Sequence, residues 1–319
     1  MSEGSSPNKT GHDIADHDKT SGSKTGHDIA GRDKTGGSKT GHDIADRDLP
    51  DHAGLRKVRQ GEDCTADGCL VEARQRFDAA RTAVITLAPR ERHGIGMQSE
   101  KTLHAVLKNY IDPDEDHQEI LIDNYVADIC HNGRITEIQT AHMDAMRARL
   151  RCFLPQYPVR IVYPIPAEKW IIWVDPETGE LLKKNRSPLR GSFYHAFREL
   201  YRIRPFLLDP NLSLELMLID IDEYRLLDGW SRDRKRGSHR YDRIPVRLRD
   251  RMILTCPRDY MQFVPADLEE PFTSAEFAKT AGFNKKGFST ILLILTEAGV
   301  VERIGKRGNS WLYRVTQKW

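Results

Sequence analysis

Hydrophobic and polar residues recur with two different periods along the middle of the chain, and these periods predict its elements. Residues 68–88 and 99–111 space their apolar side chains three and four positions apart, which predicts two helices. Three short runs of β-branched and apolar residues follow, and they predict three strands at 119–123, 125–130 and 134–140. The pattern therefore begins with helices and continues with a meander of strands.

The same two periods continue to residue 222. Residues 141–155 and 192–207 are amphipathic and predict helices, whereas 159–165, 169–174 and 212–222 are rich in β-branched, aromatic and aliphatic residues and predict strands. The order of helix, three strands, helix, strands, helix and strand is typical of a mixed α/β domain. We place this domain at residues 97–223.

The N-terminal region is repetitive instead. Units that begin at Lys9, Lys24 and Lys39 follow a period of fifteen residues, and each contains a single Ile as its large apolar residue. Such units bury too little surface to offset the entropy of ordering, so residues 1–66 are expected to be a disordered tail. Alternatively, the His-Asp pairs of the repeats could bind a transition metal weakly. Residues 67–96 then form a linker that contains the first helix.

Composition narrows the class of protein. No apolar run reaches the roughly 18 residues of a membrane span, and the polar N-terminus lacks a secretory leader, so we expect a cytoplasmic protein without a membrane partner. The five cysteines are an odd, scattered set, which predicts reduced thiols. Cys64 and Cys69 have no second cysteine pair to complete a zinc site.

Positive charge is concentrated after the α/β domain. Arg and Lys number ten between Arg225 and Arg251, against four Asp. We interpret residues 224–265 as a basic connecting segment. It could follow a phosphate backbone, with Trp230 and Tyr241 available for stacking, or it could be a solvated charged loop.

The C-terminal residues 272–315 resemble a winged helix-turn-helix, so we place that domain at 266–319. Thr273 and Glu276 form a capping box, Gly282 lies in the expected turn, and a hairpin with a basic tip ends the unit. The resemblance implies DNA as partner, because residues at the start of the second helix reach base edges and the wing contacts phosphate. Dimerisation or protein contact is the alternative. The implied nucleic-acid-binding residues are Asn284, Lys285, Lys286, Ser289, Lys306 and Arg307.

A second candidate site lies in the strand meander. Two-residue periodicity places Glu137 and Gln139 on one face of their strand, and a turn at 131–133 would bring Asp128 close to Glu137. Paired carboxylates suit a hard cation such as Mg²⁺. The alternative is a sheet that has acidic residues at its open face, and Asp220 and Asp222 could add to such a face.

The same stretch resembles the core of the PD-(D/E)XK nucleases, in which a helix precedes a three-stranded meander with the catalytic Asp on its second strand and Glu-x-Lys on its third. The resemblance implies a restriction-endonuclease-like fold. It also implies that Asp128 and Glu137 bind Mg²⁺ or Mn²⁺, with Gln139 at the Lys position and Glu100 as an additional acidic residue. Gln139 lacks the positive charge of Lys. A catalytically weak or inactive domain, an active nuclease and a protein-interaction module therefore all stay open.

Residues 97–317 also look like a family of uncharacterised bacterial proteins. The phrases "WVDPETGE" and "EYRLLDGWSRDRKRGS" carry this likeness, which implies no activity.

Overall fold

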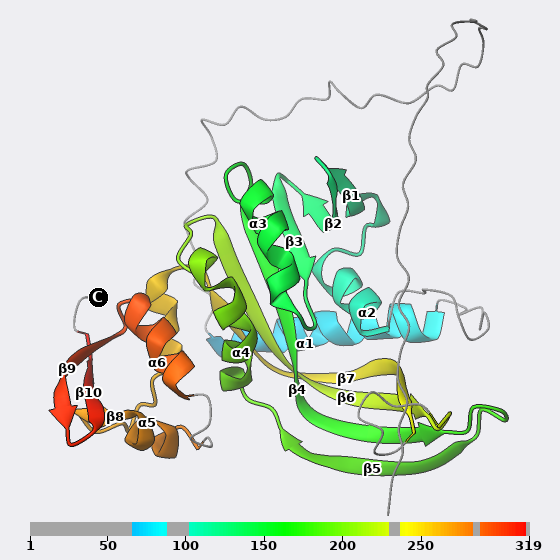
Figure 1. The fold of residues 1–319 in the computed structure, drawn as a ribbon. Coiled ribbons are helices and arrows are strands. Elements are labelled where there is room, and N and C mark those ends of the chain that lie inside the picture. Colours follow the sequence, from blue (N-terminus) through cyan, green and yellow to red (C-terminus); the bar gives the residue numbers. More distant parts are fainter. Residues whose placement is uncertain (1–65, 88–101, 230–236, 283–287, 317–319) are drawn as a thin grey trace, which may run out of the picture. The chain divides into compact units, whose positions relative to one another are not determined.

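The computed structural model describes residues 66–87, 102–229, 237–282 and 288–316, which are coloured along the chain in Figure 1. All of these residues belong to the second of two units of the chain, 61–319. The predicted repeat tail lies outside the described residues, apart from its last position. Within them, no helix combines the length and the apolar character that crossing a bilayer requires.

One large mixed sheet organises the fold. Its strands lie in the order β1-β2-β3-β4-β6-β7, and β5 pairs with β4. The first three strands pair antiparallel, β4 runs parallel to both β3 and β6, and β7 returns antiparallel to β6. The strands are β1 (Gln118–Ile122), β2 (Tyr125–His131), β3 (Arg134–Ile138), β4 (Val159–Val174), β5 (Leu181–Arg190), β6 (Leu212–Leu226) and β7 (His239–Leu254).

Helices cover both faces of this sheet. On one face, α1 (Ala66–Thr82), the π-helical turn η2 (Ala83–Leu87) and α2 (Thr102–Ile111) pack on the sheet. On the other face lie the 3₁₀ helix η4 (Met143–Met146), α3 (Arg147–Phe153) and the short helices η5 (Phe193–Ala196), α4 (Phe197–Leu200) and η6 (Tyr201–Phe206). Adjacent strand residues serve opposite layers: Ile161 packs with α3, and Val162 packs with α2. The fold is therefore mixed α/β.

Three predicted elements differ from the structure. Residues 159–165 and 169–174 belong to one strand, β4, because pairing with β6 resumes beyond a register shift between Pro166 and Lys169. The helix expected at 192–207 is divided into η5, α4 and η6. Ile203 has non-helical backbone angles there, and Pro205 provides no N–H for a continuous helix.

The connecting segments are more ordered than expected. Within the predicted basic segment 224–265, residues 239–254 form β7, whose pairing with β6 extends from Leu226↔His239 to Leu214↔Leu254. The 3₁₀ helix η7 (Pro257–Phe263) follows it. The predicted linker helix also packs on the core, because Ala73, Phe77 and Ala80 are buried against α2 and the sheet.

The C-terminal elements form a smaller layered arrangement. They are β8 (Phe272–Thr273), α5 (Ser274–Thr280), α6 (Phe288–Glu297), β9 (Val301–Arg307) and β10 (Ser310–Val315), with a sheet of order β8-β10-β9. The predicted capping box is present: Thr273 Oγ1 accepts from Glu276 N at 3.3 Å, and Glu276 Oε2 accepts from Thr273 N at 2.7 Å. The apolar residues of α6 join the same core as α4, η6 and η7.

Candidate functional site

Asp128 lies where the pairing of β2 with β3 ends. The last backbone pair on this side is Ile129↔Thr136. Beyond it, the Asp128 carboxylate replaces the ladder, since Oδ2 accepts a hydrogen bond from Ile138 N at 2.7 Å. His104 of α2 approaches the same oxygen, with Nε2 at 3.3 Å. The Asp128 carboxylate is therefore held by its own hairpin. Helix α2, which precedes this hairpin in the chain, lies beside it.

Glu137 is a buried carboxylate with incomplete pairing. Its side chain is only 2% exposed, and Oε2 accepts from Arg149 Nη1 of α3 at 2.7 Å. Within the described part of the chain, no group donates to Oε1, which is also buried. Burial and the neighbouring charge of Asp128 raise the pKa of Glu137 to about 7, and Arg149 and His104 offset only part of this effect.

The negative charge of Asp128 therefore acts on Glu137, while their partners come from α2 for Asp128 and from α3 for Glu137. The buried, unpartnered Oε1 of Glu137 and the carboxylate of Asp128 are the hard oxygen donors that Mg²⁺ or Mn²⁺ takes. The types of donor suit such an ion, but among the described residues Glu137 does not join Asp128 and His104 in a close group of three candidate ligands. At the same time, Arg149 already supplies a positive charge to Glu137. The raised pKa means that Glu137 can also hold a proton near neutral pH.

Gln139 is directed elsewhere. Its Nε2 donates to the backbone carbonyl of Ala141 and, at 3.1 Å, to that of His142. The amide donor that would stand in for the Lys of the nuclease motif is thus used to hold the loop after β3. The other predicted member, Glu100, lies outside the described residues.

Two site residues were missed from the sequence. His104 lies next to the apolar residues of the α2 face, and Arg149 lies in an amphipathic stretch with several arginines. From the sequence alone, neither residue can be distinguished from an ordinary polar residue of a helix. The one usable signal is that both helices flank the predicted hairpin, so that a charged residue on either could reach the carboxylates.

Among the C-terminal elements, Ser289 is exposed in the first turn of α6. Asn284, Lys285 and Lys286 lie outside the described residues. Arg307 Nη1 donates to Glu276 Oε1 at 2.7 Å, so its charge is used to tie β9 to α5. Lys306 instead lies over the ring of Trp311, with Nζ 4.6 Å from the ring centroid.

Trp311 is the centre of a cluster that the sequence did not single out. Arg303 lies over the same ring, with its guanidinium carbon 5.0 Å from the centroid. The indole is nevertheless 44% exposed. We call Arg303, Lys306 and Trp311 the hairpin cluster. It combines a partly exposed indole on β10 with two cations of β9 that lie over its ring.

The other acidic candidates are paired. Asp220 accepts from Arg247 and Arg249 of β7, the latter at 2.6 Å, and Asp222 accepts from Lys184 of β5 at 2.8 Å. Much of the positive charge of β7 is therefore neutralised across the sheet. Tyr241 is exposed on β7, and Trp230 lies outside the described residues. The described cysteines, Cys69, Cys130, Cys152 and Cys256, form no disulfide with one another.

Comparison with known proteins supports one coarse assignment. Residues 101–255 match the model of a family described as "Domain of unknown function (DUF8091)". A protein of Treponema pallidum (strain Nichols), named "Uncharacterized protein", is 28% identical over 216 residues, which cover 67% of this chain and 85% of that protein. No solved structure matches the chain. The predicted likeness to a family of uncharacterised proteins is confirmed at this level, and the match to the DUF8091 family extends over residues 101–255, which include both Asp128 and Glu137.

Proposed function

We propose that this protein is a cytosolic DNA-binding protein. In this proposal a C-terminal winged helix-turn-helix contacts DNA, and a domain of the PD-(D/E)XK nuclease type, with weak or absent catalytic activity, carries it. The observation on which the proposal depends most is the hairpin cluster, because an exposed Trp311 between two cations is suited to nucleic acid. Cations attract phosphate, and an exposed indole stacks on bases.

The order of elements supports the winged-helix assignment. A capped helix α5, the turn at Gly282, the helix α6 and the hairpin β9–β10 follow one another as that motif requires. Ser289 is exposed at the start of α6, the part of a recognition helix that reaches base edges. Lys306 then lies on the strand that would form the wing.

The order of elements also supports the nuclease-like assignment. Helix α2, the antiparallel meander β1-β2-β3, helix α3 and the parallel strand β4 reproduce the arrangement of that core. Asp128 lies on the second strand and Glu137 on the third. Weak or absent catalysis is favoured because Gln139 holds loop carbonyls and Arg149 occupies one oxygen of Glu137.

The test is the salt dependence of binding to duplex and single-stranded oligonucleotides. For Lys306→Ala we expect the negative slope of log affinity against log salt concentration to become shallower by about 1, since one phosphate contact is lost. Trp311→Ala should weaken single-strand binding by about 5- to 150-fold, which corresponds to the roughly 1–3 kcal/mol of one stacked base. Fluorescence anisotropy at several salt concentrations measures both effects.

Arg314→Ala is the matched control, because Arg314 is an exposed cation of the same hairpin that pairs with Glu302 at 2.7 Å. It should leave the slope almost unchanged. Equal losses in Lys306→Ala and Arg314→Ala would mean that general charge, not the hairpin cluster, binds DNA. Absence of binding by the wild-type protein at low salt would refute DNA binding and leave protein interaction as the leading role.

A second candidate function, metal-dependent nucleic-acid cleavage, is favoured by the unpartnered Oε1 of Glu137 beside Asp128. Asp128 and Glu137 would hold the divalent ion, which would supply an activated water and stabilise charge on the phosphate. On the main proposal, wild-type protein in Mg²⁺ or Mn²⁺ should cleave DNA no faster than Asp128→Asn. Cleavage that chelator and Asp128→Asn both abolish would instead establish the nuclease, and Gln139→Lys should then raise the rate by about 10²-fold.

A further inference from the structure

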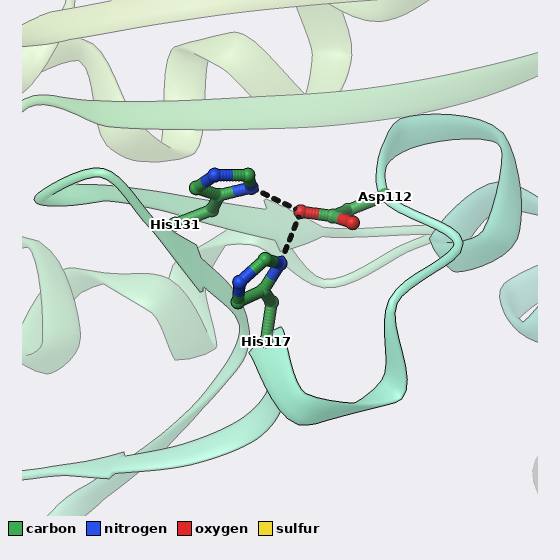
Figure 2. A group of neighbouring side chains, drawn as sticks. All are labelled: Asp112, His117 and His131. Carbon is green, nitrogen blue, oxygen red and sulfur yellow. Dashed lines mark hydrogen bonds and ion pairs between the residues drawn. The ribbon is translucent and has the colours of Figure 1, made fainter.

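Asp112, His117 and His131 form a cluster that neither candidate function uses. Asp112 directly follows α2, His117 ends the 3₁₀ helix η3 (Glu115–His117), and His131 ends β2. Asp112 Oδ2 lies 2.9 Å from His117 Nδ1 and 2.5 Å from His131 Nδ1. Figure 2 shows the two rings turned toward this one carboxylate. Their ring centroids are 3.9 Å apart and their planes are inclined at 36°, so the two imidazoles lie close together in a tilted arrangement.

The carboxylate at the centre of the cluster is held in place. Asp112 Oδ1 accepts from Asp114 N at 3.1 Å, and the Asp112 carbonyl accepts from Gln118 Nε2 at 2.9 Å. Burial alone would raise the pKa of Asp112, but hydrogen bonds from His131, the Asp114 backbone and His117 bring it below its ordinary value. An ionised, oriented carboxylate therefore faces two imidazoles. In metal sites, hydrogen bonds from surrounding residues orient the ligands in a similar way.

We propose that Asp112, His117 and His131 bind one Zn²⁺ ion, with a fourth position open to solvent. The candidate ligand atoms of these residues all lie within 4.8 Å of one another. Zinc bonds of about 2.0–2.1 Å in a tetrahedral site place neighbouring ligand atoms roughly 3.3 Å apart. The present nitrogen–oxygen separations of 2.9 and 2.5 Å must therefore widen by less than about 1 Å to admit the ion.

The ligand chemistry favours zinc over harder cations. Two imidazoles with one carboxylate suit Zn²⁺ and related transition metals, whereas Mg²⁺ and Ca²⁺ prefer oxygen ligands throughout. The surroundings are acidic, because Asp114, Glu115 and Asp116 directly precede His117. His117 and His131 are partly exposed, with side chains 31% and 44% accessible, so an ion can enter and keep a water ligand.

The proposed ion would join three segments of the nuclease-like region. Asp112 is the residue after α2, and His131 lies three residues beyond Asp128 on β2. Binding would therefore fasten the β2–β3 hairpin to the end of α2. The expected consequence is a more stable fold, since an ion that binds only the folded site adds its binding free energy to folding.

The test is thermal unfolding of the full-length protein, first in chelator and then with Zn²⁺. At a free zinc concentration 100 times the dissociation constant, the wild-type midpoint should rise on the order of 5–10 °C. His131→Gln and His117→Gln should each lose about half of this rise or more, with at least about 10-fold weaker zinc binding by calorimetry. Gln can still donate to Asp112, so both variants should fold in chelator.

His239→Gln is the matched control. His239 also pairs with an aspartate, Asp228, but the two do not belong to a group of three candidate ligands among the described residues. It should keep the full zinc-dependent rise. The His-Asp pairs of the N-terminal repeats are unchanged in every variant, so zinc bound there cannot produce a difference between them. The proposal fails if zinc leaves the wild-type midpoint unchanged, or if His131→Gln and His117→Gln keep the wild-type rise.

Discussion

At the scale of single residues, the buried carboxylate of Glu137 destabilises the folded protein when it is charged. Its pKa is raised to about 7 from an ordinary value of 4.5, so the folded protein disfavours the charged form. Below pH 4.5 the group is neutral in folded and unfolded chains and costs nothing. As pH rises from 4.5 to 7 the unfolded chain releases the proton first, and the destabilisation is complete above pH 7.

Glu137→Gln should remove this pH dependence in metal-free buffer. A difference of about 2.5 pH units at about 1.4 kcal/mol each sets an upper bound near 3.5 kcal/mol. Relative to wild type, the variant should therefore gain on the order of 2–3 kcal/mol in unfolding free energy between pH 5 and pH 8. Urea unfolding at both pH values measures the gain.

The control for that comparison is Glu177→Gln, which changes an exposed carboxylate in the turn between β4 and β5. Its stability relative to wild type should be nearly the same at pH 5 and pH 8. If Glu137→Gln behaved in the same way, Glu137 would not be the group that titrates near pH 7.

At this scale, sequence can position residues where one short hairpin decides the geometry. Asp128 and Glu137 could be placed on neighbouring strands because a tight turn fixes the register of β2 with β3 up to Ile129↔Thr136. His104 and Arg149 could not, because their approach depends on how two helices pack on opposite faces of the sheet. Gln139 was misjudged because its direction depends on the following loop, where His142 has a left-handed φ of 59°.

Ligand clusters assembled from separate loops were also beyond the sequence. Asp112, His117 and His131 are spread over a helix end, a 3₁₀ helix and a strand end, so no spacing motif marks them. Only the folded chain brings the three side chains together. Trp311 was missed for a related reason, since exposure of an aromatic residue on a predicted strand depends on which face the core covers.

At the scale of elements, apolar periodicity predicted the helices and strands that bury one face. It failed for β7, whose sequence is dominated by arginine and other polar residues. This strand is stabilised by ion pairs across the sheet as well as by burial: Arg251 approaches the fully buried Glu215, and Arg249 pairs with Asp220. A strand of this kind looks like a solvated basic segment until its acidic partners on β6 are known.

At the scale of the whole unit 61–319, the sheet region and the C-terminal elements share an apolar core. Phe288 of α6 lies 6.0 Å from Tyr194 of η5 and 5.5 Å from Phe277 of α5, measured between ring centroids. Phe197 and Phe263 continue the contact at 4.6 Å. An ion pair between Arg204 and Glu297 lies at the same junction. The two regions should therefore unfold together, although sequence reasoning placed a boundary near residue 266.

Phe288→Ala tests this coupling. Removal of a fully buried Phe costs roughly 3–5 kcal/mol, which for a chain of this size lowers the unfolding midpoint on the order of 10 °C. Because the core is shared, calorimetry should show one transition for residues 61–319, and the whole transition should move. Ile304→Ala, an exposed position on β9, should change the stability by less than about 0.5 kcal/mol. Two transitions, of which Phe288→Ala shifts only the smaller, would show instead that the C-terminal elements fold as an independent domain.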